Sequence, residues 1–325
     1  MEEIGYIDWE RAKAVGRGLV PPGPKLPAPE IKSLVASIKE AAGKAGEHVA
    51  RVTELDAPAA ADILVLDRAR WIEACAASAG VVLANLGATD QPKGRIDKIA
   101  GTTRGVQVGV AFAAVATRVL GQFDPFSPAS RLLLVAPNVA EVESELKVDP
   151  EDFRLWVCLH EETHRFQFGH APWLTGHILN SIKQLLDAEG EVSWPKKSDR
   201  SSLLDMVMSP EQKAQFDQVS AVMTLMEGHA DVMMDRVGVQ VLPTLPIIRR
   251  AFEARRDRRG WTALLGKFIG ADLKLAQYRD GAQFCRAVID AVGVPGLNKA
   301  FSAAEFLPSW AEIHDPAAWV SRVHP

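Results

Sequence analysis

Cysteine is scarce in this sequence, and its three occurrences lie far apart. Cys75, Cys158 and Cys285 are too widely separated to form a disulfide framework or a cysteine-based zinc motif. A reducing compartment is therefore the environment that the sequence favours.

The chain also lacks an excess of charge and a long apolar run. With 37 basic and 41 acidic residues, the formal net charge is −4, which gives no support for nucleic-acid binding. The longest apolar stretch, near residues 105–117, is too short to span a bilayer. Residues 1–10 lack the basic start and apolar block of a signal peptide. We expect a soluble, cytoplasmic protein with no nucleic-acid and no membrane partner.

What is present is typical of a globular, mainly helical protein. Hydrophobic residues make up 47% of the 325 positions and charged residues 24%, so a disordered or collagen-like chain is excluded. A proline-rich connector covers residues 21–29. Beyond it, apolar spacing predicts helices over residues 31–55, 63–86 and 96–120.

A second break, at residues 124–128, suggests a division of the chain. We expect an N-terminal helical region over residues 1–125 and a catalytic region over residues 126–325. Leu132 to Ala136 is the best strand candidate, although a buried helical turn has the same pattern. The predicted fold is mainly α with a small β-sheet, packed near the helix described next.

Residues 160–164 read His-Glu-Glu-Thr-His, the H-E-x-x-H pattern. Two histidines four positions apart share one face of a helix, so His160 and His164 can bind one metal ion, and imidazole is a good zinc ligand. The Glu161 carboxylate can reach a metal-bound water and act as its general base.

The surrounding sequence supports a metal site. Asp149 is a suitable N-cap and Pro150 a suitable first residue for a helix that carries both histidines on its apolar face. Two histidines and a glutamate buried there without a partner would be costly, and a metal removes that cost. The alternative is a pair of satisfied core histidines.

A catalytic zinc has three protein ligands and one open position, so a third ligand is needed. Glu227 is one candidate, on a helix that a Ser209–Gln212 capping box begins. Asp231, one turn later, could accept the ring N–H of a ligand histidine. The alternative is that both carboxylates are solvated or salt-bridged.

His170 is the second candidate for third ligand. It lies ten residues after His160, the spacing of the third histidine in metzincins, which have glycine where this chain has Gln167. His177, on a following helix, is a candidate to polarise a substrate carbonyl. His229 should point away from the ion that Glu227 faces. For these last two histidines a packing or surface role is the alternative.

These motifs resemble the gluzincin branch of the zincin metallopeptidases, in which H-E-x-x-H is followed by a helix with E-G-x-A-D. The resemblance implies that Glu227 is the third zinc ligand and that Asp231 supports a ligand histidine. Several stretches are similar to a bacterial zincin-like family of unassigned reaction, labelled as zinc-dependent metalloproteases or hydrolases, or as associated with deazaflavin-coenzyme biosynthesis. The similar stretches are Val135–Asn138, His160–Phe168, Pro172–Leu174 with His177, and Glu227–Asp235.

We therefore expect a zinc-dependent hydrolase, a metallopeptidase acting on a peptide or small amide, with Zn²⁺ bound by His160, His164 and Glu227. Two alternatives stay open. One is a zinc-binding scaffold without turnover, in which His170 or His229 fills the fourth position. The other is a hydrolase of a non-peptide amide or ester.

Overall fold

The computed structural model describes residues 5–127, 129–187, 209–259 and 273–325. The fold is mainly helical with one small sheet, as predicted. The backbone divides into two units. The first comprises Met1–Val52, Ala57–Phe166 and Val237–Phe252, and the second comprises Thr53–Asp56, Gln167–Arg236 and Glu253–Pro325. The division expected at residue 125, which rests on the sequence break over residues 124–128, stays a prediction.

The sheet belongs to the first unit and has three strands in the order β1-β3-β2. Strands β1 (Asp62–Leu66) and β3 (Arg131–Val135) are parallel, whereas β2 (Gly121–Asp124) runs antiparallel to β3. The strand predicted at residues 132–136 is confirmed, except that Ala136 already begins the next helix. Because β3 is the central strand, its backbone cannot serve as a free edge.

One predicted helix was wrong at its start. The sequence predicted a helix over residues 63–86, but Asp62–Leu66 is strand β1 and helix α3 covers only Arg68–Asn85. Asp67 separates the two elements, because its Oδ1 accepts a hydrogen bond from the Arg70 N–H at 2.7 Å and caps α3.

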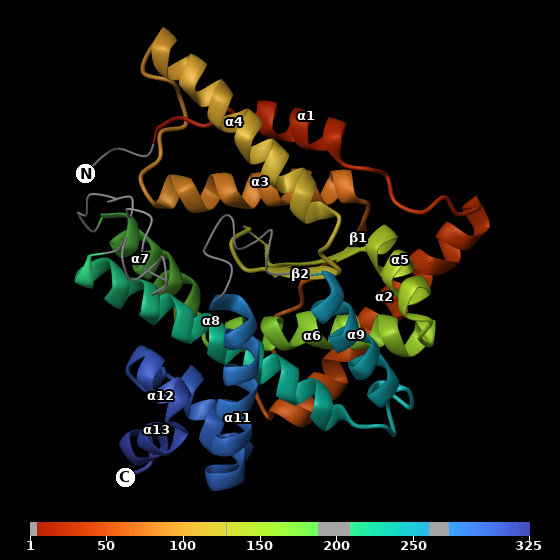
Figure 1. Cartoon of the computed structure of the whole chain (residues 1–325), viewed down its shortest axis with the longest axis vertical. Helices are drawn as coiled ribbons and strands as arrows, with labels where there is room; N and C mark the ends of the chain where they lie inside the picture. Colours follow the sequence, from red (N-terminus) through yellow and green to blue (C-terminus); the bar gives the residue numbers. More distant parts are fainter. Residues whose placement is uncertain (1–4, 128, 188–208, 260–272) are drawn as a thin grey trace. The chain divides into compact units, whose positions relative to one another are not determined.

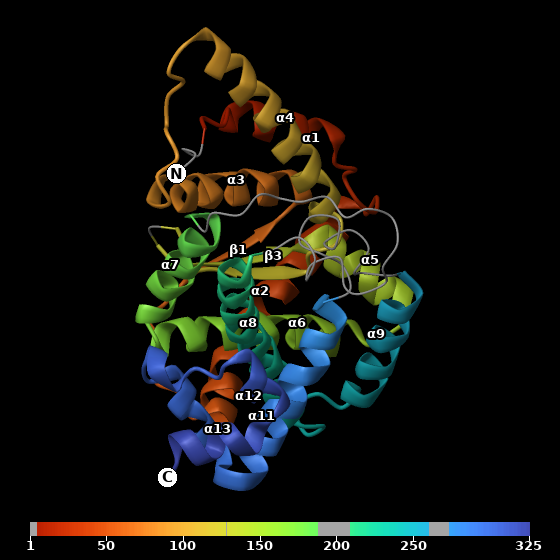
Figure 2. The same cartoon turned by 60° about the vertical axis from the view of Figure 1, so that its left-hand side comes forward.

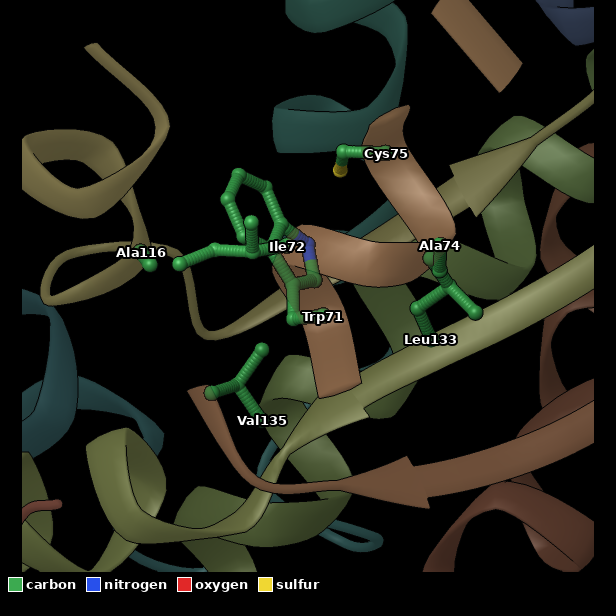
Figure 3. Packing of buried hydrophobic residues seen from close by; sticks show 7 residues of the cluster. All are labelled: Trp71, Ile72, Ala74, Cys75, Ala116, Leu133 and Val135. Atoms are coloured by element: carbon green, nitrogen blue, oxygen red, sulfur yellow. The ribbon is translucent and has the colours of Figure 1, made fainter. Parts of the chain in front are cut away.

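Helices cover both faces of this sheet. Figure 1 and Figure 2 show α3 on one face and α6 (Pro150–His170) on the other. The core between α3 and the sheet contains Trp71 and Ile72 of α3 against Leu133 and Val135 of β3 (Figure 3). The remaining helices of this unit are α1 (Trp9–Leu19), α2 (Ala28–Thr53, whose last residue is in the second unit), α4 (Arg95–Ala116), α5 (Ala136–Leu146) and the first half of α9 (Leu245–Arg259).

Helices α1 and α4 pack with their backbones nearly touching. A Cβ added at Gly105 of α4 would be 2.4 Å from the Asp8 carbonyl oxygen, and one at Gly109 would be 2.5 Å from the Ala12 carbonyl oxygen. Glycine is therefore required on this face of α4 for lack of space. In the described part of the chain, α4 is also the one helix long and apolar enough to cross a membrane by length and composition.

Within the described residues, the second unit contains helices and connecting loops but no strand. Figure 1 and Figure 2 show α12 and α13 beside α11, which they contact. The elements of this unit are α7 (Trp173–Asp187), α8 (Pro210–Val237), α11 (Leu273–Asn298), α12 (Trp310–His314), α13 (Pro316–Val323) and the short 3-10 helices Lys299–Phe301 and Ala304–Phe306.

Candidate metal centre

Helix α6 carries the H-E-x-x-H pattern and begins where the sequence predicted. The Asp149 carboxylate accepts hydrogen bonds from the backbone N–H groups of Glu151 and Asp152, each at 3.0 Å. Phe153 and Val157 are buried, as the apolar stripe required. The cap and the stripe thus fix both the start and the rotation of the helix.

The rings of His160 and His164 meet on one face of α6. Their Nε2 atoms are 3.2 Å apart, and the ring planes are nearly perpendicular. Two nitrogens that bind one tetrahedral zinc at the usual bond length would be about 3.3 Å apart. The pair therefore already has the spacing that one zinc ion requires.

The two glutamates between these histidines have different surroundings. Glu161 is buried, and its Oε2 accepts a hydrogen bond from the backbone N–H of Phe123 in β2 at 3.1 Å. Glu162 is also buried and forms an ion pair with Arg165 at 2.7 Å. Burial raises the pKa of Glu162, and the Arg165 guanidinium partly opposes that rise.

Arg165 connects α6 to the segment that precedes β1. Its Nη1 donates to the carbonyl oxygen of Ala59 at 2.9 Å. Because Arg165 also pairs with Glu162, this link restrains the helix relative to the sheet of the same unit. Glu162 thus restrains α6 between the two histidines, and Arg165 restrains it just after His164.

Helix α8 carries Glu227 and begins at the predicted cap. The Ser209 hydroxyl accepts from the Gln212 N–H, and the Gln212 side chain accepts from the Ser209 N–H, which is a capping box. Gly238, with a φ of 79°, follows the last residue of α8.

Glycine next to Glu227 allows a close helix crossing. A Cβ at Gly228 would be 2.1 Å from the Gly281 carbonyl carbon, so α8 and α11 cross here backbone to backbone. One turn further along α8, Asp231 lies 3.6 Å from the Arg286 guanidinium of α11. The predicted alternative of a salt-bridged carboxylate therefore describes one contact of Asp231.

Gln167 connects the end of α6 to α8 within the second unit. Its Nε2 donates to the Met226 carbonyl oxygen at 2.9 Å and lies 3.0 Å from Nδ1 of His229. His229 is fully buried, with its ring against Phe301. Gln167 thus binds the helix residue that precedes Glu227, and His229 has the packed position that the sequence suggested.

The structure contains a group of three residues that could hold a metal ion: His160, His164 and Glu227. His160 and His164 belong to the first unit and Glu227 to the second. Two imidazoles and a carboxylate are a donor set suited to zinc. The ligand set that the sequence predicts stays a prediction.

His170 is outside this group. Helix α6 continues unbroken to His170, which places its Cα about 15 Å along the helix axis from that of His160. Its Nδ1 instead lies 3.2 Å from the Asp56 carboxylate. Gln167 continues the helix where metzincins have a glycine that lets the chain turn back.

His177 lies in α7, with its ring at the edge of the Trp173 ring. Its Nε2 is buried and has no hydrogen-bond partner among the described residues. Burial lowers the pKa of His177, so the imidazole is mostly neutral at pH 7.

Sequence reasoning missed the residues that support these side chains. Gly121 and Phe123 contact Glu161, Gln167 connects α6 to α8, and Gly228 permits the crossing with α11. The glycine in the E-G-x-A-D motif was a signal for the crossing, because glycine inside a helix indicates a close approach.

The comparisons with known proteins agree with this description. No protein of curated function matches the chain. The chain resembles the crystal structure of a protein of novel fold from Chloroflexus aurantiacus that has been proposed to be a hydrolase. The identity is 29% and the TM-score 0.73, over 97% of this chain and 98% of the other. A family model described as zincin-like metallopeptidase matches residues 7–320. The metal-ligand pattern and this match over nearly the whole length lead to the same conclusion: the chain belongs to the zincin-like metallopeptidase family.

Proposed function

We propose that this protein is a zinc-dependent hydrolase that cleaves amide bonds, with peptides as the leading substrate class. The observation that carries the proposal is the 3.2 Å separation of the two Nε2 atoms on α6, with Glu161 next to His160. The family match and the hydrolase activity proposed for the Chloroflexus protein support the same reaction class.

The proposed ligands are His160, His164 and Glu227. Support for Glu227 comes from the second unit, where Gln167 at the end of α6 donates to the carbonyl of Met226. Gln167 follows His164 by less than one helical turn, and Met226 directly precedes Glu227. The end of α6 is therefore bonded to α8 at the residue next to the proposed third ligand.

Each functional side chain has a defined task in this proposal. Bound zinc supplies Lewis acidity, which makes a water molecule acidic near neutral pH and polarises a carbonyl group. Glu161 accepts the proton of the attacking water and delivers it to the leaving nitrogen. Asp231 accepts the ring N–H of a ligand histidine and so holds that ring in place. His177, in its neutral form, donates a hydrogen bond to the substrate carbonyl oxygen.

A zinc scaffold without turnover is the first rival. A structural zinc normally has four protein ligands, whereas the group found among the described residues has three members. The two histidines that could add a fourth have other partners: His170 lies at Asp56, and His229 lies at Gln167. These contacts favour an open coordination position. The second rival is a hydrolase that acts on a non-peptide amide or ester. It would use the same chemistry, so a substrate screen is needed to distinguish it from a peptidase.

We also propose that the protein works in a reducing compartment such as the cytoplasm. All three cysteines are free thiols and all are buried. The structure therefore contains no disulfide that an oxidising compartment would have to form.

Metal analysis tests the ligand set. After zinc loading and dialysis, the wild type and His170→Ala should each retain one zinc per chain, whereas His160→Ala and Glu227→Ala should lose it. His170→Ala is the matched control, because this histidine is on the same helix. Zinc retained in Glu227→Ala and lost in His170→Ala would reverse the assignment.

Substrate screening tests the reaction. The zinc-loaded protein is incubated with a peptide library and, separately, with small amides and esters, and Glu161→Gln serves as the blank. Glu161→Gln should keep zinc and lose hydrolysis. Peptide cleavage by the wild type alone supports the proposal, whereas cleavage of only small amides or esters supports the second rival. No hydrolysis, with a fourth protein ligand seen on the zinc, would establish the scaffold.

A further inference from the structure

The Glu161 carboxylate lies at the outer edge of strand β2. This strand pairs only with β3 in the described sheet, so its other edge carries backbone groups that need partners elsewhere. In an antiparallel pair, the backbone groups of every second residue point toward the partner strand. Leu120 is such a residue, because its carbonyl oxygen accepts from the Val135 N–H at 2.9 Å. By this alternation the Phe123 N–H points outward, and it donates to Glu161 Oε2 at 3.1 Å.

Gly121 gives the same glutamate the room that it needs. A Cβ added at Gly121 would be 2.6 Å from Glu161 Cγ and 3.0 Å from both Cδ and Oε1. Real Cβ atoms essentially never approach another atom closer than 3.0 Å. Gly121 is not among the residues with positive φ, so its backbone does not require glycine. The reason for glycine at this position is space for Glu161.

The two contacts act on different parts of one side chain. The Phe123 amide holds one carboxylate oxygen, which restricts rotation about the last side-chain bond of Glu161. Gly121 admits the Cγ and Cδ atoms, so the carboxylate can reach that amide. Glu161 is itself buried, and it has little space into which a displaced side chain could move.

From this geometry we infer that β2 is a positioning element for the general base. Gly121 and the Phe123 amide together form a cradle that sets the orientation of the Glu161 carboxylate. The catalytic consequence rests on the proposed function, because only a hydrolase uses Glu161 as a base. A displacement of about 1 Å in a reacting group can cost about a hundredfold in rate, so the cradle should affect turnover and not metal binding.

Amide hydrogen exchange at Phe123, measured by NMR on the full zinc-loaded chain, tests the cradle without any substrate. Glu161→Gln keeps an oxygen that can accept the bond and should leave exchange close to the wild-type rate. Glu161→Ala removes the acceptor and should speed exchange at least about tenfold. Gly121→Ala should speed it as well, because the new methyl group displaces Glu161. Gly43→Ala is the control, since a Cβ there meets nothing within 4 Å.

Zinc content and kinetics test the positioning role. Gly121→Ala should retain one zinc per chain, lose about a hundredfold in kcat and change KM little. The rate is referred to the folded fraction, measured by circular dichroism, because unfolding alone would lower the apparent kcat and leave KM unchanged. Gly43→Ala should match the wild type in both constants.

The outcomes separate the cradle from the proposed function. Unchanged Phe123 exchange in Glu161→Ala, or wild-type kcat in Gly121→Ala, would overturn the inference. The comparison of Glu161→Ala with Glu161→Gln decides the matter even if Gly121→Ala does not fold. If exchange behaves as expected but the wild type hydrolyses nothing, the cradle stands as a structural contact and the proposed function fails.

Discussion

Gly228 of α8 lies directly against Gly281 of α11, and a Cβ on either glycine would come within 2.1 Å of a backbone atom of the opposite helix. Neither helix can accept a side chain at this crossing. Since Glu227 directly precedes Gly228 in α8, the crossing also restrains the proposed third ligand. This contact therefore links the packing of the second unit to the position of Glu227.

Gly228→Ala should destabilise the protein strongly. The obstacle is backbone and cannot rotate away, so we expect a loss at or above the upper end of the roughly 1–3 kcal/mol typical of overpacking. Urea unfolding followed by circular dichroism measures the loss. Gly176→Ala, on the exposed side of α7, is the control and should be neutral or stabilising by up to about 1 kcal/mol. Equal urea midpoints for the two variants would contradict this prediction, because they would show that α11 shifts to make room for the new methyl group.

Arg68→Met should destabilise the first unit. The buried Arg68 side chain donates to Asn138 Oδ1 at 2.6 Å and to the Pro21 carbonyl at 3.1 Å, and it pairs with Glu141. The substitution leaves Asn138 without that donor in the core, whereas half-exposed Glu141 regains water. We expect a loss of about 2 kcal/mol in urea unfolding. Arg70→Met, at an exposed position of the same helix, should change little, and a similar loss there would contradict this account.

The three thiols should be inert in the native protein. Burial raises the pKa of Cys75, Cys158 and Cys285, so almost no reactive thiolate exists near neutral pH. A chromogenic disulfide reagent should label none of them in buffer and all three in guanidinium chloride. Rapid labelling of one cysteine under native conditions would show that its burial is transient.

His177 should make stability dependent on pH. Burial lowers the pKa of His177 below 6.5, so the unfolded chain binds a proton more readily than the folded chain does. The resulting stability is complete above about pH 6.5 and is lost as the pH falls through 6.5 toward the folded pKa. NMR titration of the ring should give a midpoint below 6.5, and acidification to about pH 5 should destabilise the wild type more than His177→Gln. A midpoint at or above 6.5 would exclude this contribution.

The elements that the sequence predicted well are those with local signals. Helices α6 and α8 have caps and apolar stripes that can be recognised within a few residues, and His160, Glu161 and His164 follow from spacing on one helix. Strand β1 has no such signal, because an apolar run before α3 fits a helix equally well. Its extended form depends on β3, whose Arg131 pairs with Asp62 from 69 positions further along the chain.

The supporting contacts of the site depend on similarly distant residues. The Phe123 amide reaches Glu161 across 38 positions, and Gln167 reaches Met226 across 59. Neither pairing leaves a periodic pattern, since each joins a single side chain to a single backbone group. The sequence could therefore indicate which residues are candidates to bind a metal, but not which residues hold those candidates in place.

Helix α1 packs against the glycine backbone of α4, and this has a practical consequence for truncation of the chain. Trimming the chain beyond Leu19 would uncover a strip of α4 with no side chains of its own to shield it from solvent. Shortened versions of the protein should then aggregate or be degraded. Residues Trp9–Leu19 are accordingly an integral part of the packing of the first unit.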